Sequence, residues 1–459
     1  MNPRVVIAGT ESGVGKTTVT IGLMAALDKQ GYNVQPYKVG PDYIDPGFHT
    51  LVTGNQSRNL DSFFLGEEGV KESFLNAGGE SDISIIEGVM GLFDGKKGTD
   101  GAGSTAHIAK ILETPVVLVM DVKKMARSAV ALAYGYQNFD ADLNIAGIIL
   151  NNVGSKGHFE MIKKPLEEEV GVKVLGYLPY QKDLELPERH LGLVPTFESK
   201  ELANFRSQLV ELIEKYIDLE QLVSLSQEGT GVEVTEKKIF TSAKDYNLTL
   251  GVAYDEAFNF YYQDNFDLLA SRGVDLKFFS PIEDNKLPKV DGLYIGGGFP
   301  ESFLQQLVNN KSIKQDIYRH IREDLPTYAE CGGLMYLTEE IIDNEGKRFP
   351  MVGAVSGQVK MTDSLQAMGY VDVKAVRDNI LLKQGEKAKG HEFHYSKLIN
   401  LADESKQVYQ LYGGRGEEGR LEGIVRDNLL VSYVHLHFGS QPKVINRFLG
   451  YCQKYKRGS

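Results

Sequence analysis

The sequence contains only two cysteines, Cys331 and Cys452, and they lie far apart along the chain. Small secreted proteins that depend on disulfide bonds carry many closely spaced cysteines, so a disulfide framework is not expected here. Tryptophan is absent altogether, and the large aromatic side chains are those of tyrosine and phenylalanine. The low cysteine content favours a reducing compartment, and the expected location is the cytoplasm.

The sequence also lacks a long apolar run and a basic stripe. No stretch approaches the ~20 apolar residues that a membrane-spanning helix needs. Residues 1–8 already show a strand pattern, so a signal peptide is not expected. The formal net charge is −12, whereas nonspecific nucleic-acid binding requires clustered Lys and Arg. We therefore expect neither a membrane nor a nucleic acid as a partner.

At 459 residues the chain is too long for one typical core, and its length predicts two domains. Short apolar runs alternate with helical stretches, a pattern typical of a buried parallel sheet. The runs lie at 5–8, 83–86, 116–120, 145–150, 172–176, 248–254, 292–295 and 327–329. A helix is expected over 202–223, followed by a polar junction. The predicted organisation is α/β throughout, with an N-terminal domain at 1–224, a linker at 225–245 and a C-terminal domain at 246–459.

A glycine-rich turn between a strand and a helix predicts a phosphate-binding loop. Gly13 and Gly15 are followed by Lys16, Thr17 and Thr18, and this spacing directs backbone N–H groups and a helix N-terminus at phosphate oxygens. Lys16 would neutralise the outer phosphates of ATP, and the Thr17 hydroxyl would bind magnesium. The alternative is a glycine-rich turn that binds no nucleotide.

Four acidic residues in the first domain are candidates for metal or substrate binding. Glu87 follows the run at 83–86, whose carboxyl end would face the nucleotide, and with Asp42 it is a candidate magnesium ligand. Asp42 and Asp45 lie in a loop that two prolines fix, and Asp94 lies in a glycine-flanked loop. For each of the four, the alternative is an acid that caps a turn.

Two asparagines, Asn151 and Asn152, follow the run at 145–150. Their amides could hydrogen-bond the adenine base, but asparagine at the end of a strand is equally often a turn residue. Both interpretations stay open.

A second site is predicted around Cys331, which follows an apolar strand and precedes two glycines. At such a strand-to-helix turn the sulfur is expected to be exposed, with N–H groups and a helix dipole that lower the pKa of the thiol. Residues 431–438 alternate as one strand, so His435 and His437 would share a face and either could act as the base. The N–H groups of Gly297, Gly298 and Gly332 are expected to form the oxyanion site. The alternative is a buried structural cysteine, and Cys452 is given no function.

Eight segments together resemble a known enzyme family. They lie at 9–17, 38–46, 87–95, 103–107, 186–193, 329–333, 390–396 and 432–438. The C-terminal half resembles class I glutamine amidotransferases of the cobyrinate and cobyrate synthase branch, and the N-terminal half resembles P-loop enzymes of the dethiobiotin synthetase group. The whole chain resembles the cobyrinate a,c-diamide synthase family, since the segments follow the family's order over nearly the full length.

The resemblance implies ATP-dependent amidation of the a and c acetate groups of cobyrinate, a corrin macrocycle, with L-glutamine as the nitrogen donor and ATP and Mg²⁺ as cofactors. It implies that Cys331 is the nucleophile and His435 its base, and that Lys16, Thr17 and Glu87 serve ATP and magnesium. The segments that the family uses around phosphoryl transfer and substrate contain Asp42, Tyr43, Ile44, Asp45 and Asp94.

The sequence departs from ordinary class I amidotransferases at one position. Many of them carry a glutamate two residues after the catalytic histidine, and here that position holds His437. We therefore expect a dyad of Cys331 and His435, with Glu330 or Glu392 considered as an assisting carboxylate.

Two alternatives for the whole chain remain. Hydrogenobyrinate or a nickel-containing sirohydrochlorin could replace cobyrinate, and the sequence does not separate these rings. The other alternative is a P-loop ATPase switch with an inactive amidotransferase-like binding module. Glu11 argues against it, because partition-type ATPases carry an extra lysine at that position. A homodimer is the oligomeric state considered.

Overall fold

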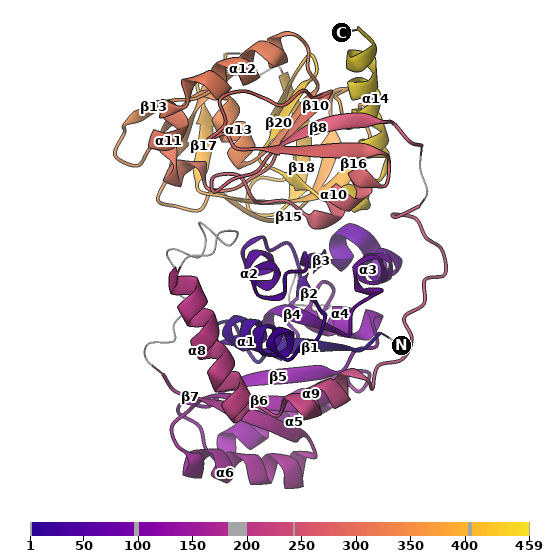
Figure 1. The fold of residues 1–459 in the computed structure, drawn as a ribbon, viewed down its shortest axis with the longest axis vertical. Helices are drawn as coiled ribbons and strands as arrows, with labels where there is room; N and C mark the ends of the chain where they lie inside the picture. The colour runs from indigo at the N-terminus through magenta and orange to yellow at the C-terminus, as the bar shows by residue number, and fades with distance from the viewer. Residues whose placement is uncertain (1, 96–100, 182–199, 242–243, 403–405, 459) are drawn as a thin grey trace. The chain divides into compact units, whose positions relative to one another are not determined.

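The structure is a computed structural model that describes residues 2–95, 101–181, 200–241, 244–402 and 406–458 (Figure 1). The segment 186–193, which contributes to the family resemblance, lies outside the described residues. The chain divides into two compact units, Met1–Lys238 and Ile239–Ser459, and the division falls within the segment 225–245 that was expected to be a linker. Part of that segment packs on the first unit, since Arg4 Nη2 donates a 2.6 Å hydrogen bond to the Thr230 carbonyl oxygen.

Within the described part of the N-terminal unit, seven strands form one parallel sheet in the order β3-β2-β4-β1-β5-β6-β7. The strands are β1 (Arg4–Gly9), β2 (Val34–Val39), β3 (Arg58–Leu60), β4 (Ile83–Gly91), β5 (Val116–Asp121), β6 (Ile145–Val153) and β7 (Lys173–Pro179). The predicted parallel sheet is confirmed. Because successive side chains of a strand point to opposite faces, β1 contributes Val5 and Ile7 to one core and Val6 and Ala8 to the other.

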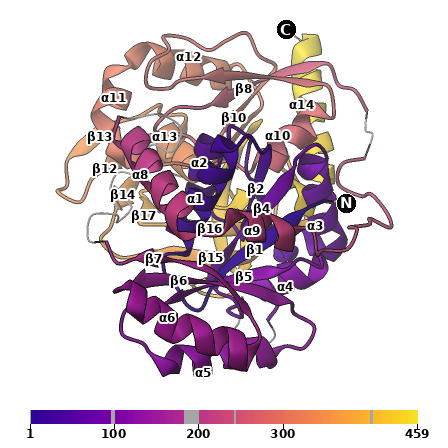
Figure 2. The ribbon, with the colours of Figure 1, turned by 60° about the horizontal axis from the view of Figure 1, so that its bottom comes forward.

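Helices cover both faces of this sheet. They are α1 (Lys16–Lys29), α2 (Ile44–Thr53), α3 (Ser62–Gly78), α4 (Thr105–Ile111), α5 (Arg127–Phe139), α6 (Lys156–Pro165), the π-helical turn η1 (Leu166–Val170), α8 (Lys200–Tyr216) and α9 (Leu219–Ser226). Helices α1, α2, α8 and α9 pack on one face, and α3 to α6 pack on the other. Figure 1 shows α1 beside α8, and Figure 2 shows α5 beside α6. The phosphate loop connects the end of β1 at Gly9 with the start of α1 at Lys16.

The single helix expected over 202–223 is wrong, because the chain forms α8 and α9 with a break at Ile217 and Asp218. Ile217 forms an antiparallel bridge with Gly176 of β7, and the Asp218 backbone N–H donates to the Leu175 carbonyl oxygen at 2.8 Å. The Asp218 carboxylate then caps α9 by accepting from the Gln221 backbone N–H at 2.9 Å. The tertiary contact with β7 thus interrupts a sequence whose local pattern is helical throughout.

In the part of the C-terminal unit that the structure describes, ten strands form a mixed sheet in the order β21-β16-β15-β18-β19-β20-β11-β10-β8-β9, and four form a smaller sheet in the order β13-β12-β14-β17. The strands are β8 (Leu248–Ala253), β9 (Val274–Phe279), β10 (Gly292–Ile295), β11 (Thr327–Glu330), β12 (Thr338–Ile342), β13 (Arg348–Pro350), β14 (Val355–Met361), β15 (Ala367–Ala375), β16 (Lys387–His394), β17 (Ser396–Ile399), β18 (Gln407–Gly413), β19 (Arg420–Arg426), β20 (Leu429–Ser432) and β21 (His435–Leu436). The strands from β9 to β20 by way of β8, β10 and β11 are parallel. Strands β15, β16, β18 and β19 pair in antiparallel fashion.

The helices of this unit are α10 (Gln263–Ala270), the 3-10 turn η2 (Pro300–Ser302), α11 (Leu304–Asn309), α12 (Lys311–Arg322), α13 (Gly332–Leu337), the 3-10 turn η4 (Phe438–Ser440) and α14 (Lys443–Gly458). With its parallel strands and helices, the unit confirms the second α/β domain. Among the residues described in either unit, no helix combines the length and the apolar character that crossing a membrane requires.

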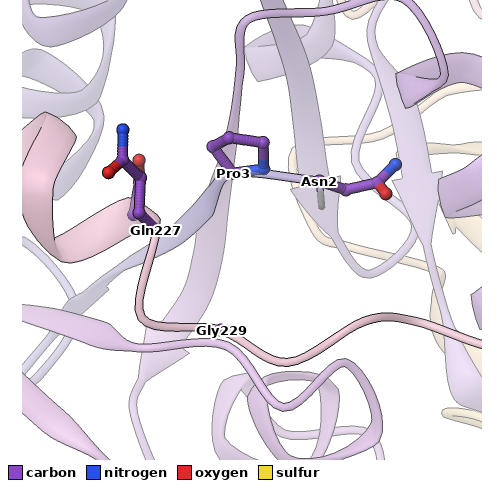
Figure 3. A pocket seen from close by; sticks show the side chains of 5 residues that line it. Asn2, Pro3, Gln227 and Gly229 are labelled. Atoms are coloured by element: carbon purple, nitrogen blue, oxygen red, sulfur yellow. The ribbon is translucent and has the colours of Figure 1, made fainter.

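A hollow of about 230 Å³ lies at the start of β1 and is lined by Asn2, Pro3, Ser226, Gln227 and Gly229 (Figure 3). The phosphate loop follows the other end of β1. No residue that the sequence analysis singled out for binding or catalysis lines this hollow, which has no part in the sites below.

Candidate active sites

The phosphate loop depends on two glycines with left-handed backbone conformations. Gly13 has φ 85° and Gly15 has φ 86°, a region that other residues seldom adopt. A Cβ atom on Gly15 would also clash with the Asn151 side-chain amide. The loop therefore brings its backbone close to β6, and Lys16 begins α1 directly after it, with Thr17 and Thr18 in its first turn.

The two asparagines considered for the base lie within β6 and bond to protein. Asn151 Nδ2 donates to the Val14 carbonyl oxygen at 2.8 Å, so this side chain supports the phosphate loop. Asn152 has φ 59°, and its Nδ2 donates to Asp121 Oδ2 at 2.9 Å.

Glu87 is the centre of a buried polar cluster beside the phosphate loop. It lies within β4, not beyond its end, and it is fully buried. Its Oε1 accepts from the Thr17 hydroxyl at 2.6 Å and lies 3.5 Å from Lys16 Nζ, while its Oε2 lies 2.6 Å from His49 Nε2. Burial alone would raise the pKa of Glu87, but the Lys38 ammonium and the hydrogen bond with His49 hold that pKa well below its usual range. Glu87 is thus an ionised carboxylate next to the Thr17 hydroxyl.

Sequence reasoning missed two members of this cluster, Lys38 and His49. Lys38 is 2% exposed, and its Nζ lies 2.5 Å from Asp45 Oδ2 and 3.1 Å from Glu87 Oε1. A lysine is seldom buried unless it is paired, and Lys38, the last residue but one of β2, lies just before the acidic loop, a position that could have signalled such a pairing. His49 lies on α2, one turn after Asp45.

The other two candidate acids, Asp42 and Asp94, accept hydrogen bonds from backbone N–H groups at turns. Asp42 Oδ1 accepts from the backbone N–H groups of Ile44 and Asp45 at 2.8 and 3.1 Å, at the start of α2. Asp94 Oδ2 accepts from the Gly91 backbone N–H at 3.0 Å, next to the beginning of the phosphate loop. Tyr43 is half-buried, and Ile44 packs against the core beneath α1.

The donor set of this cluster suits magnesium, which typically takes one or two carboxylates together with substrate phosphates and water. The Thr17 hydroxyl and the ionised Glu87 carboxylate supply hard oxygen donors side by side. Within the described ranges, no group of three or more His, Cys, Asp and Glu side chains is arranged to hold a metal ion. An ion here would therefore depend on the nucleotide for further ligands.

In the second unit, Cys331 occupies a sharp turn between β11 and α13. Its φ of 45° is strained for a residue other than glycine, and its backbone N–H donates to the Ser432 carbonyl oxygen at 2.8 Å. A Cβ atom on Gly333 would clash with the Ile295 carbonyl oxygen, and one on Gly332 would lie 3.1 Å from the Gly298 backbone nitrogen. The two glycines after the cysteine thus allow the turn to approach the loop that follows β10.

Two expectations for the Cys331 thiol are wrong. Cys331 is buried, with 6% of its surface exposed, and its sulfur is not displayed at the surface. The pKa of the thiol is raised and not lowered, because burial and the nearby Glu301 carboxylate outweigh the hydrogen bond from the Gly332 backbone N–H. A neutral thiol in this position needs a base to remove its proton.

The single strand expected over 431–438 is also wrong, since β20 ends at Ser432 and β21 contains only His435 and Leu436. His435 borders the predicted oxyanion loop, because a Cβ atom on Gly297 would clash with its Cε1. His437 is fully buried elsewhere, where its Nδ1 accepts from the Gly439 backbone N–H at 3.1 Å and its ring lies against Tyr262. The structure therefore separates the roles of the two histidines and leaves His435 as the candidate base.

The candidate oxyanion donors gather around this turn. The Gly296 backbone N–H donates to the Tyr261 hydroxyl at 2.7 Å, so Gly297 and Gly298 are the glycines of the loop that remain candidates. Gly332 lies against Gly298. The structure thus places His435 against Gly297, and Gly332, which follows Cys331, against Gly298.

Comparisons with known proteins match both units. Residues 5–194 match the CobQ/CobB/MinD/ParA nucleotide binding domain, and residues 249–443 match the CobB/CobQ-like glutamine amidotransferase domain. The cobyrinate a,c-diamide synthase of Caldanaerobacter subterraneus subsp. tengcongensis is 46% identical over 98% of both chains. The enzymes of that name from Priestia megaterium and Archaeoglobus fulgidus are 45% and 43% identical, each over 99% of this chain and 98% of its relative.

Proposed function

Because the chain belongs to the cobyrinate a,c-diamide synthase family, we propose that it converts the a and c acetate carboxylates of cobyrinate into amides in cobalamin biosynthesis. ATP activates each carboxylate, and glutamine supplies the nitrogen. The observation that carries this proposal is the 46% identity over 98% of both chains. A nucleotide-binding unit and a glutamine amidotransferase unit are the two parts that such a ligase requires.

In the first unit, the proposed step is transfer of the ATP γ-phosphoryl group to the substrate carboxylate. A carboxylate is a poor electrophile, and the acyl phosphate that forms has a good leaving group. The loop at Gly13 and Gly15 would hold the phosphates with its N–H groups, and Lys16 would offset the charge that develops during transfer.

We propose that Mg²⁺ is held by Thr17, Glu87 and Asp42, with phosphate oxygens completing its ligands. When bound, the ion supplies positive charge at the transferred group. The Glu87 carboxylate supports this role, because it is already ionised and bonded to the Thr17 hydroxyl.

The substrate acetates are proposed to lie near Asp42, Tyr43, Ile44, Asp45 and Asp94. These residues flank the start of α2 and the beginning of the phosphate loop. Asp45 is also paired with Lys38, so this ammonium stands close to where an incoming carboxylate would approach.

In the second unit, Cys331 would attack the side-chain amide of glutamine with His435 as base. The N–H groups of Gly297, Gly298 and Gly332 would stabilise the oxyanion. Ammonia leaves, and water then hydrolyses the glutamyl thioester. The ammonia displaces phosphate from the acyl phosphate and forms the amide.

The identity of the ring is tested by supplying the purified protein with ATP, magnesium, glutamine and one macrocycle at a time. We expect mass spectrometry to show cobyrinate gaining two amides. Faster amidation of hydrogenobyrinate or of nickel-sirohydrochlorin would reassign the substrate within the same chemistry.

We propose the cytoplasm as the location and a homodimer as the assembly. Light scattering on the purified protein would check the homodimer.

A further inference from the structure

We propose that Glu330 positions His435, so that the glutaminase site draws its assisting carboxylate from the residue that directly precedes the nucleophile. Glu330 ends β11, and its Oε2 lies 3.8 Å from His435 Nδ1. The Glu330 side chain is 2% exposed and that of His435 is 3% exposed. The inference rests on the proposed function, because it concerns the same Cys331 and His435 site.

The fold holds the Glu330 carboxylate with three donors. Its Oε1 accepts from the Tyr328 hydroxyl at 2.6 Å and from the Leu436 backbone N–H at 2.9 Å. Its Oε2, the oxygen that faces His435, accepts from the Tyr294 hydroxyl at 3.1 Å. Hydrogen bonds of this kind favour the ionised form of a buried carboxyl group. Burial raises the pKa of Glu330 to about 7, and the Tyr328 hydroxyl is the strongest influence against that rise.

The short strand that contains His435 also donates a backbone hydrogen bond to Glu330. Leu436, whose N–H donates to Glu330, directly follows His435 in β21. The imidazole also lies close to Gly297, where any Cβ atom would clash with His435 Cε1. The ring is therefore in contact with the oxyanion loop and near the Glu330 carboxylate.

Two other positions considered for an assisting group, 437 and Glu392, have different partners. His437 occupies the position where many class I amidotransferases carry glutamate, and its Nε2 lies 3.7 Å from Asp264 on α10. Glu392 of β16 forms an ion pair with Arg420 of β19. Glu330, 3.8 Å from Nδ1, is therefore the proposed partner of His435.

In the proposed mechanism, His435 carries each proton that moves. His435 takes the proton from the Cys331 thiol as sulfur forms its bond to the glutamine carbonyl carbon, and the imidazolium then gives that proton to the leaving ammonia. Water later gives a proton to His435 as its oxygen attacks the thioester, and the proton returns to the departing cysteine sulfur. The positive imidazolium is buried both when the thioester forms and when it is hydrolysed. A fixed carboxylate at Nδ1 stabilises this cation and orients the ring.

The test is Glu330→Gln in the full chain, which keeps the shape of the side chain and removes its charge. We expect the glutaminase kcat to fall about 100-fold, at the lower end of the range for general acid–base catalysis, with the KM for glutamine nearly unchanged. The acid limb of the kcat/KM profile against pH should move to lower pH, because the carboxyl that titrates near neutrality is gone. Burial and the neighbouring His391 and His394 of β16 lower the pKa of His435, and these two histidines stay in place in the variant.

The matched control is Glu422→Gln. Glu422 is also a buried carboxyl whose pKa burial raises to about 7, and it accepts from Ser432 Oγ and from the Tyr433 backbone N–H. Its replacement should leave the acid limb in place. A Glu330→Gln variant with a wild-type kcat and an unmoved acid limb would overturn the assignment.

Two further measurements keep the test decisive. If Glu330→Gln does not fold, Tyr294→Phe is the alternative variant, because it removes only the hydroxyl that bonds Glu330 Oε2. The acid limb of its kcat/KM profile should move to higher pH. An unmoved limb would contradict the proposal. Amide formation with ammonium in place of glutamine should survive in Glu330→Gln. A wild-type protein without any glutaminase activity would instead overturn the proposed function itself.

Discussion

The buried cluster around Glu87 places charged side chains beside the phosphate loop. Lys38 reaches two carboxylates and the Gly88 carbonyl oxygen from a nearly inaccessible position. Burial alone would lower the pKa of Lys38, but the Glu87 and Asp45 carboxylates raise it above its ordinary value, so the side chain stays an ammonium. Positive charge is thus fixed beside the loop before a nucleotide arrives.

Replacing Lys38 by Met is predicted to destabilise the protein by about 3 kcal/mol or more, because removing one partner leaves buried charge uncompensated. Calorimetric unfolding of the full chain measures the change. The control is Lys29→Met, which removes a 2.8 Å ion pair with Glu214 whose lysine is 57% exposed, and exposed pairs contribute only about 0.2 to 1 kcal/mol. Equal losses in the two variants would contradict the importance of the buried cluster.

The sequence pointed to several of the side chains at each site, but it did not indicate Lys38, His49 or the electrostatics. Cys331 shows why, because its position after a strand and before two glycines predicts the turn correctly. Its pKa depends on burial and on Glu301, which only the folded chain places nearby. The same holds for His49, since nothing in its local sequence indicates a 2.6 Å contact with Glu87.

Among the elements, prediction succeeded where the local pattern and the tertiary contacts agree. The apolar runs of the N-terminal parallel sheet became strands because both faces of that sheet are covered. Prediction failed at 202–223, where the bridge between Ile217 and Gly176 breaks a helical pattern. The antiparallel strands β15, β16, β18 and β19 were not foreseen, although the alternating burial of residues in β15 carries the period-two signal of a strand.

The break between α8 and α9 leads to a prediction about a helix cap. Asp218→Ala removes the carboxylate that accepts from the Gln221 backbone N–H and should destabilise the protein by about 1 kcal/mol. Asp218→Asn keeps an acceptor oxygen and should change stability little. Thermal denaturation followed by circular dichroism compares the two. A loss in Asp218→Asn as large as that in Asp218→Ala would indicate that charge, and not capping, matters at this position.

For the whole molecule, two chemically different sites lie on two units of one chain. The first places an ionised carboxylate, a hydroxyl and two ammonium groups next to a phosphate loop. The second places a buried thiol, a histidine and a carboxylate around a glycine loop. The sequence predicted this combination because each site is carried by a short local motif, whereas the partners supplied by distant strands became apparent only in the fold.

We propose that the Cys331 site produces ammonia for a separate ATP-dependent amidation. The most direct test is the rate of diamide formation by wild type and Cys331→Ala with cobyrinate, ATP and magnesium, using glutamine in one series and concentrated ammonium in the other. We expect Cys331→Ala to lose activity with glutamine and to keep it with ammonium. Diamide formation by Cys331→Ala with glutamine at the wild-type rate, or no diamide from the wild type with either nitrogen source, would contradict this proposal.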